Sequence, residues 1–150
     1  MILLDTNVIS ELWKAAPAPQ VLAWMDGQMI ETLCLSAITV AELRFGLAAL
    51  PEGKRRTTYL ERLERDVLPA FSGRIVPFDL EASRSYSDLM TRARKAGKAI
   101  GLSDGYIAAS AATRGLIVAT RDTSPFEAAG LTVINPWETA GGQARLRPLP

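Results

Sequence analysis

Histidine is absent from the 150-residue chain, and cysteine occurs once, at Cys34. The absence of histidine excludes a Ser-His-Asp or Cys-His triad, a histidine general base and any histidine metal ligand. A single cysteine excludes an internal disulfide and a cysteine zinc cluster, and we expect Cys34 in the core. If the chain is an enzyme, its chemistry must come from carboxylates, lysine, hydroxyls or a bound hard cation.

Long apolar runs are missing as well. No segment approaches the ~20 residues needed to span a bilayer. The N-terminal residues Met-Ile-Leu-Leu-Asp lack the basic region of a signal peptide. The composition, 48% hydrophobic and 22% charged, is that of an ordinary globular domain. We therefore expect a soluble, cytoplasmic protein with no membrane partner.

Charge is nearly balanced, with 17 basic and 16 acidic side chains and a net charge of +1, so it indicates no particular partner. Two stretches are nonetheless basic, and they contain Lys54, Arg55, Arg56, Arg62 and Arg65, and Arg92, Arg94, Lys95 and Lys98. Each stretch fits a solvated helix face, a surface for phosphate, or a surface for dimerisation or a partner protein. The sequence leaves these alternatives open.

Short, wholly apolar runs alternate with segments of helical periodicity. The runs predict buried strands at 1–4, 32–35, 116–119 and 131–134, with a weaker candidate at 74–78. Helices are expected at 8–13, 21–25, 37–50, from 54 to a stop at Pro69, at 80–96, and from a Ser103 cap to Gly115. This alternation predicts an α/β fold with a mainly parallel sheet of four to five strands flanked by helices. We expect one domain over 1–140 and a loosely held tail over 141–150.

Four acids fall where predicted strands meet helices. Asp5 follows the first strand, Glu42 and Asp104 come early in helices, and Asp122 follows the strand at 116–119. Ligands bind beyond the carboxyl ends of strands in open α/β sheets, so these positions favour a shared site. A helix dipole, a turn and an exposed helix edge are local alternatives for Asp104, Asp122 and Glu42. Asp5 is harder to explain in this way, because an acid at the end of a buried strand needs a partner or a cation.

Clustered carboxylates without histidine suit Mg²⁺ or Mn²⁺ and not zinc. Such ions activate water and stabilise charge during an in-line displacement at phosphorus, so no protein nucleophile is needed. Without these four acids, the remaining 17 basic and 12 acidic side chains carry a net charge of +5. A modestly basic surface around an acidic pit suits a polyanion.

Five segments then match, in order and spacing, the motifs of a known family. They are residues 2–12 (ILLDTNVISEL), 36–46 (SAITVAELRFG), 103–109 (SDGYIAA), 119–122 (ATRD) and 133–137 (VINPW). The chain resembles PIN-domain ribonucleases, in particular the toxin subunits of the VapBC type and the similar FitB branch, from residue 1 to about 137.

The resemblance implies a PIN-like three-layer domain and a Mg²⁺- or Mn²⁺-dependent endoribonuclease whose products carry a 5′-phosphate and a 3′-hydroxyl. It implies metal ligands and catalytic acids at Asp5, Glu42, Asp104 and Asp122. It implies supporting roles for Thr6 and Asn7 beside the first acid and for Thr120 and Arg121, the latter on phosphate or paired with the acids. It also implies a homodimer and an antitoxin whose C-terminal segment covers the acidic pit.

The fourth motif departs from the family pattern. Many relatives have Thr-Arg-Asn-x-x-Asp-Phe, whereas this chain has an acid at Asp122 and a proline at Pro125 in place of the later acid. The departure leaves the fourth ligand and the number of metals open. Asp122 is the expected ligand because it is the only acid in that segment.

Two other functions fit part of the sequence. Asp5 resembles the covalent nucleophile of haloacid dehalogenase-type phosphohydrolases, but those enzymes usually carry a second Asp two residues on, where this chain has Asn7. The second alternative is a PIN fold that binds RNA or a protein without cutting. Trp13 and Trp24 are expected to pack in the protein and not to stack on bases.

Overall fold

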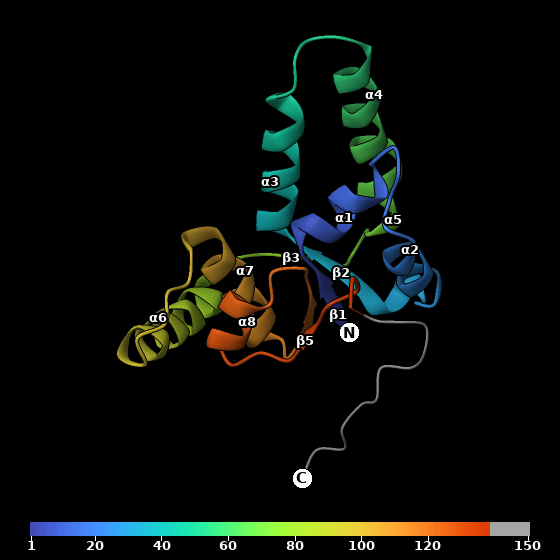
Figure 1. Cartoon of the computed structure of the whole chain (residues 1–150). Helices are drawn as coiled ribbons and strands as arrows, with labels where there is room; N and C mark the ends of the chain where they lie inside the picture. Colours follow the sequence, from blue (N-terminus) through green and yellow to red (C-terminus); the bar gives the residue numbers. More distant parts are fainter. Residues whose placement is uncertain (139–150) are drawn as a thin grey trace.

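The computed structural model describes residues 1–138, so the predicted tail at 141–150 and the domain end at 140 lie outside the described residues. Figure 1 shows helices arranged around a small central sheet. Of the described helices, none is long and apolar enough to cross a membrane. The elements are β1 (Ile2–Leu4), α1 (Thr6–Leu12), α2 (Pro19–Asp26), η1 (Ile30–Thr32), β2 (Leu33–Ser36), α3 (Ala37–Ala48), α4 (Lys54–Arg62), η2 (Leu63–Val67), α5 (Leu68–Ala70), β3 (Ile75–Val76), α6 (Leu80–Lys95), α7 (Leu102–Thr113), β4 (Ile117–Ala119), α8 (Ser124–Ala128) and β5 (Val133–Ile134).

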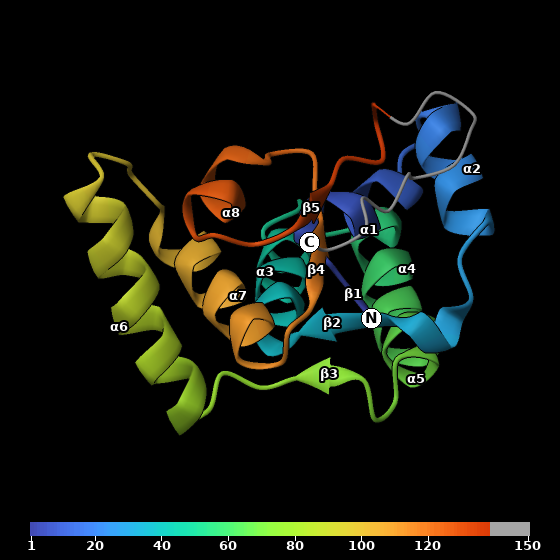
Figure 2. The same cartoon turned by 90° about the horizontal axis from the view of Figure 1, so that it is seen from below.

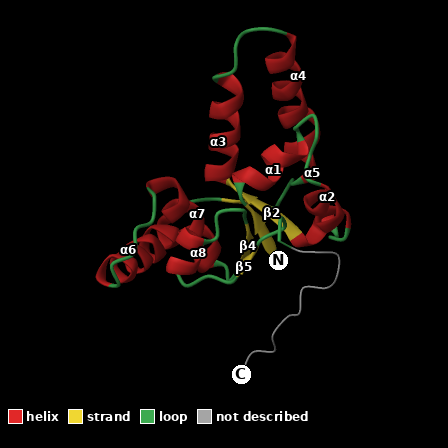
Figure 3. Ribbon diagram, viewed as in Figure 1, coloured by secondary structure: helices red, strands yellow, loops and turns green. Residues whose placement is uncertain are grey.

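Five parallel strands form the sheet in the order β3-β2-β1-β4-β5, and Figure 3 shows them together at the centre of the molecule. The central strand β1 pairs with β2 and β4, so that Leu3 lies opposite both Cys34 and Val118. This confirms the predicted α/β fold and the parallel sheet. The weaker strand expected at 74–78 is present but is reduced to the two residues of β3 at the edge.

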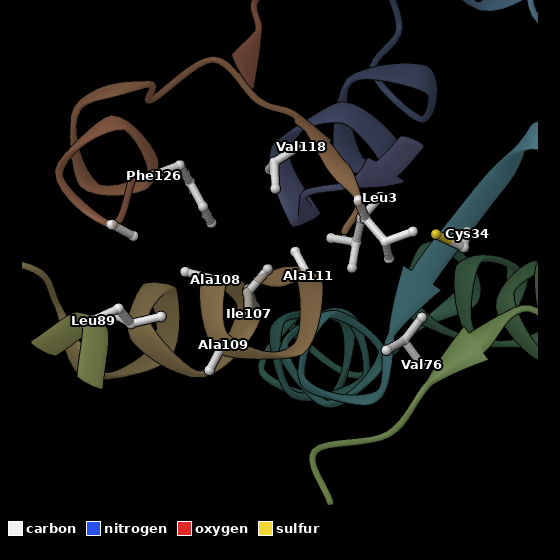
Figure 4. Close-up of a cluster of buried hydrophobic side chains, with 12 residues drawn as sticks. Leu3, Cys34, Val76, Leu89, Ile107, Ala108, Ala109, Ala111, Val118 and Phe126 are labelled. Carbon is white, nitrogen blue, oxygen red and sulfur yellow. The ribbon is translucent and has the colours of Figure 1, made fainter. Parts of the chain in front are cut away.

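Successive side chains of β1 enter two different hydrophobic clusters. Leu3 packs with Cys34, Val118 and residues of α7 such as Ile107, and Figure 4 shows this cluster. Leu4 belongs to the second cluster, which contains residues of α1 and α3. In Figure 2, α6, α7 and α8 lie on one side of β1 and β4, and α1, α4 and α5 lie on the other. The three-layer arrangement and the core position of Cys34 are therefore confirmed.

Helices α3 and α4 project beyond the sheet as an antiparallel pair (Figure 1). The inner face of α3 enters the second cluster through Val40, Leu43 and Leu47. The hydroxyl of Tyr59 on α4 donates to the carbonyl oxygen of Trp13 at 3.1 Å, which ties α4 to the end of α1. The pair of helices thus lies beside α1.

The expected cap at Ser103 is wrong. Helix α7 begins at Leu102 with Gly101 as its N-cap, and Gly101 accepts a hydrogen bond from the backbone N–H of Gly105 at 2.9 Å. Ser103 therefore lies inside the first turn, and its hydroxyl oxygen is buried without a hydrogen-bond partner among the described residues. Gly101 has an extended backbone, with φ −63° and ψ 155°, and occupies the N-cap position that was expected for Ser103.

The helical stretch from Lys54 ends at Ala70, within one residue of the expected stop at Pro69, but its course was not predicted. A π-helical turn, η2, precedes the proline, and the backbone N–H of Leu68 reaches back to the carbonyl of Leu63. Pro69 lacks an N–H, and its ring clashes with the carbonyl four residues earlier in a regular α-helix. The wider π turn places that carbonyl differently, so the proline fits into the last helical turn, which ends at Ala70.

Gly105 lies where α7 packs closely against α6. A Cβ at this position would lie 3.0 Å from the Sδ of Met90 and 3.0 Å from the Cε2 of Tyr86. The Tyr86 ring is itself packed against Tyr106, with ring centroids 4.8 Å apart, so it cannot move freely. Gly46 inside α3 differs, because a Cβ there would meet no atom within 4 Å.

These surroundings predict opposite effects for two glycine-to-alanine substitutions. Gly46→Ala should raise the free energy of unfolding by up to about 0.5–1 kcal/mol, since alanine is a better helix former than glycine and Gly46 lies in the last turn of α3. Gly105→Ala should lower it by about 1–3 kcal/mol, because the added methyl group overpacks the α6–α7 contact. Urea unfolding of both variants measures the difference. A gain in stability at Gly105 equal to that at Gly46 would contradict the close packing.

Candidate functional site

The four acids singled out in the sequence gather around the carboxyl end of β1. Asp5 caps α1 directly after β1, Glu42 lies in α3, Asp104 lies in the first turn of α7, and Asp122 lies beyond β4. Asp5 is 5% exposed, Glu42 and Asp104 are half-buried, and Asp122 is exposed. Repulsion by Asp104 and Glu42 contributes to the raised pKa of Asp5, and repulsion by Asp122 and Glu42 contributes to that of Asp104. The structure therefore brings together four carboxylates from four separate segments.

Both oxygens of the Asp5 carboxylate accept hydrogen bonds. Oδ1 accepts from the backbone N–H of Thr6 at 2.8 Å. Oδ2 accepts from the hydroxyl of Thr120 at 2.8 Å and from the amide of Asn7 at 3.3 Å. The backbone N–H of Asp5 also donates to the carbonyl of Ala119 at 2.9 Å, which continues the β1–β4 pairing. The orientation of the carboxylate is therefore set from β4 as well as from α1.

Thr120 is fully buried, and its hydroxyl is the centre of these contacts. Its Oγ1 accepts from the amide of Asn7 at 3.2 Å and from the backbone N–H of Asp122 at 3.1 Å. A hydroxyl has one hydrogen and two acceptor lone pairs, so with both lone pairs engaged its hydrogen points to Asp5. Thr120 thus orients Asp5 and also anchors the backbone of Asp122.

Thr6 and Asn7 extend the same network. The hydroxyl of Thr6 donates to Oε1 of Glu42 at 3.1 Å, which links the acids of α1 and α3. The side-chain oxygen of Asn7 accepts from the backbone N–H of Arg121 at 3.2 Å. The guanidinium of Arg121 lies over the ring of Trp137, 5.5 Å from its centroid. Within residues 1–138, Arg121 forms no ion pair with any of the four acids.

Burial shifts the ionisation of this cluster. The pKa of Asp5 is raised to about 6, chiefly because the carboxylate is removed from water, while the hydrogen bonds from Thr120 and Thr6 oppose the shift. Repulsion from Asp104 and Glu42 adds to the rise. The pKa of Asp104 is also raised, first by burial and then by repulsion from Asp122 and Glu42. Burial is the larger cause of both shifts, and repulsion between neighbouring carboxylates adds to it.

The donor set fits a hard cation with a partly open coordination sphere. No three Asp, Glu or Cys side chains of residues 1–138 are placed so that they could hold a metal ion by themselves. An ion would therefore contact one or two carboxylates and complete its coordination with water or substrate oxygens. Mg²⁺ prefers this kind of coordination, and oxygen donors alone favour Mg²⁺ or Mn²⁺ over zinc.

A groove that was not predicted from the sequence adjoins the acids. It has a volume of about 340 Å³ between α1, α3 and α4, and Glu42 lies in its wall. Trp13 lines it and stacks on Tyr59, with ring centroids 6.1 Å apart and an angle of 20° between the rings. Trp13 and Trp24 both pack against the second hydrophobic cluster as expected, and both remain half-buried. One sequence signal of the groove was available, the glycine at position 46 inside a predicted helix.

The family model described as the PIN domain matches residues 2–131. The chain belongs to the PIN-domain family. This PIN domain is 72% identical over 140 residues to "VapC ribonuclease Y4jK" of Sinorhizobium fredii, covering 93% of this chain and all of the relative. It is 52% identical to "Toxin FitB" of Neisseria gonorrhoeae, covering 91% of this chain and 99% of the relative. The crystal structure of FitAcB from Neisseria gonorrhoeae matches with a TM-score of 0.90 and 51% identity, covering 92% of this chain and 99% of that one.

The raised pKa of Asp5 predicts how the stability of the metal-free PIN domain depends on pH. Because the folded state keeps the proton that the unfolded state loses above pH 3.8, this contribution is complete below pH 3.8 and disappears as the pH rises through about 6. The loss should be on the order of 3 kcal/mol, from 1.36 kcal/mol per pKa unit. Asp5→Asn should remove this part of the pH dependence.

Urea unfolding in EDTA, repeated between pH 4 and pH 7.5 for wild type and Asp5→Asn, tests this expectation. The difference between the two curves isolates Asp5 from the other acids. If the difference stays constant across this range, the carboxylate of Asp5 does not titrate as its burial requires.

Proposed function

We propose that this chain is a Mg²⁺- or Mn²⁺-dependent endoribonuclease and the toxin component of a type II toxin–antitoxin system. The observation that carries the proposal is the cluster of Asp5, Glu42, Asp104 and Asp122, whose mutual repulsion calls for a cation. The similarity to proteins named ribonuclease and toxin supports the activity and the biological role.

The residues of the cluster have distinct parts in this proposal. Asp5, Glu42, Asp104 and Asp122 would hold the cation through their combined negative charge, with one or two of them in direct contact with it. Thr120 and Thr6 keep Asp5 and Glu42 in position. When bound, the cation supplies activated water and compensates the charge that develops on the phosphate oxygens. The chain itself therefore needs no side-chain nucleophile, which fits the absence of histidine. Hydrolysis leaves a 5′-phosphate and a 3′-hydroxyl in this proposal.

The partner in this proposal is an antitoxin whose C-terminal segment covers the acidic site, and the toxin acts as a homodimer. The name "Toxin FitB" of a relative with 52% identity supports a toxin role, and the motif resemblance supports the antitoxin. A cationic side chain of the antitoxin would occupy the same negative potential that otherwise binds the metal. Contacts to phosphate carry no information about the bases, so they do not determine which RNA sequence is cut.

Substitution of the acids should abolish RNA cleavage. Asp5→Asn and Asp104→Asn each remove a charge from the cluster, and we expect losses of at least about a hundredfold in the cleavage rate, as for loss of a principal charge-stabilising group. Asp122→Asn tests the fourth position, where relatives have Asn. Cleavage of single-stranded RNA is measured with Mn²⁺ and with EDTA.

Asp88→Asn provides the matched control, because Asp88 is an exposed acid on α6 outside the cluster. This variant should cleave at the wild-type rate. Wild-type protein that binds RNA but leaves a broad panel of RNAs intact with Mn²⁺ would instead support the non-cleaving PIN module.

Metal binding should also be visible without any activity measurement. Because Asp5 must lose its proton to bind a cation, Mn²⁺ should stabilise the fold more at pH 7.5 than at pH 5. At a hundredfold excess over Kd the gain should be roughly 2.7 kcal/mol, which raises the melting temperature by several degrees. Asp5→Asn should lose this gain, and Asp88→Asn should keep it. An equal rise for wild type and Asp5→Asn would place the ion elsewhere.

A further inference from the structure

The groove between α1, α3 and α4 opens into the acidic site, because Thr6 and Glu42 line both. Its volume of about 340 Å³ lies within the range of about 300–1,000 Å³ that is usual for ligand pockets. An RNA chain with one phosphate at the carboxylates extends away from the site in both of its directions. The groove is one path that such an RNA chain can take.

Gly46 indicates that something outside the chain approaches this wall of the groove. It lies in the last turn of α3, at a helical position where alanine is the better helix former, and it lines the groove. Its backbone is not in the left-handed region, and a Cβ would meet no atom within 4 Å. Neither backbone geometry nor packing within the chain therefore requires glycine. Close approach of a ligand to the helix is a remaining physical reason for glycine at such a position.

The charge on α4 indicates that the ligand is anionic. Arg55 lines the groove, and the guanidinium carbons of Arg55 and Arg62 lie 5.6 Å and 5.8 Å from the ring centroid of Tyr59. In the described part of the chain neither arginine forms an ion pair. Lys14, the other cation of the groove, is already paired with Glu11 at 2.6 Å. Two unpaired cations beside one ring repel each other, and a phosphate near them relieves this repulsion.

Apolar side chains form much of the remaining surface, where Leu43, Leu47 and Leu50 lie beside two aromatic residues. Trp13 and Tyr59 both line the groove as a stacked pair. A surface that combines cations with aromatic rings matches single-stranded RNA, whose phosphates alternate with bases that stack on such rings.

Building on the proposed function, we propose that this groove binds the RNA nucleotide next to the cleaved phosphate. Arg55 contacts the backbone phosphate of this nucleotide, its base lies against Trp13 and Tyr59, and Gly46 leaves room for it. These residues position the substrate, and they take no part in the chemical step.

The proposal is tested by RNA binding in a cleavage-disabled Asp104→Asn background. Fluorescence anisotropy with a labelled short single-stranded RNA gives Kd at several salt concentrations. Arg55→Ala should weaken binding about threefold to tenfold and reduce the slope of log Kd against log salt by about 0.7, the value for one lost contact to a single strand. Gly46→Leu should weaken binding about tenfold or more with the slope unchanged, since it blocks the site for a base without removing charge.

Two controls separate these effects from unfolding and from general charge. Gly46→Ala should remain folded and gain stability, which shows that the helix tolerates a side chain. Arg84→Ala removes the same charge from α6, which lies on the other side of the molecule from α4 (Figure 2), and should leave Kd and the slope unchanged.

The possible results are distinct. Wild-type Kd values for both Arg55→Ala and Gly46→Leu would overturn the proposal. Unchanged RNA binding together with lost binding of a partner protein would also overturn it and would assign the groove to that protein. If the protein with its acids intact cuts no RNA but the two groove variants bind RNA more weakly, the groove proposal is supported and the proposed nuclease function fails.

Discussion

Asp5 places a carboxylate at the end of the central strand, where almost no water reaches it, and a charge in such a position is unstable without polar partners or a cation. Its partners come from two distant parts of the chain, Thr6 and Asn7 after β1, and Thr120 after β4. The same segments pair in the sheet through the bond from Asp5 to Ala119. The pairing of β1 with β4 and the orientation of the acid therefore depend on the same segments of the chain. In the proposed function, a cation would complete this arrangement by supplying the positive charge that these hydrogen bonds lack.

The positions of the acids could be predicted because strand burial and sheet direction fix them. Leu3 and Leu4 face different hydrophobic clusters, so β1 must be covered on both sides, and its apolar run shows this in the sequence. Parallel strands bring their carboxyl ends to one edge, so acids after β1 and β4 are neighbours whatever the intervening loops do. Cys34 could be assigned to the core for the same reason, because it lies in another apolar run.

The details that could not be predicted depend on contacts between residues far apart in the sequence or on backbone geometry. The hydroxyl of Thr120 bonds to Asp5, 115 residues away, and no local pattern reports which of its lone pairs are occupied. The cap at Gly101 and the π turn before Pro69 are features of backbone geometry that the residue pattern does not report. The groove requires α4 to lie against α1, and the bond from Tyr59 to Trp13 that fixes this is invisible in the sequence.

The layout of charge around the site reconciles two opposing requirements. Carboxylates repel the phosphate backbone of RNA, so the acidic cluster alone would keep the substrate away. Arg55 and Arg62 on α4 present unpaired positive charge at and beside the adjoining groove. A cation bound in the proposed metal site would reverse the negative potential of the acids. The near-neutral total charge of the chain thus conceals a separation of charge, with acids at the carboxyl end of β1 and cations on the projecting helix. Substrate attraction and metal binding can then depend on different residues, and changes in one need not weaken the other.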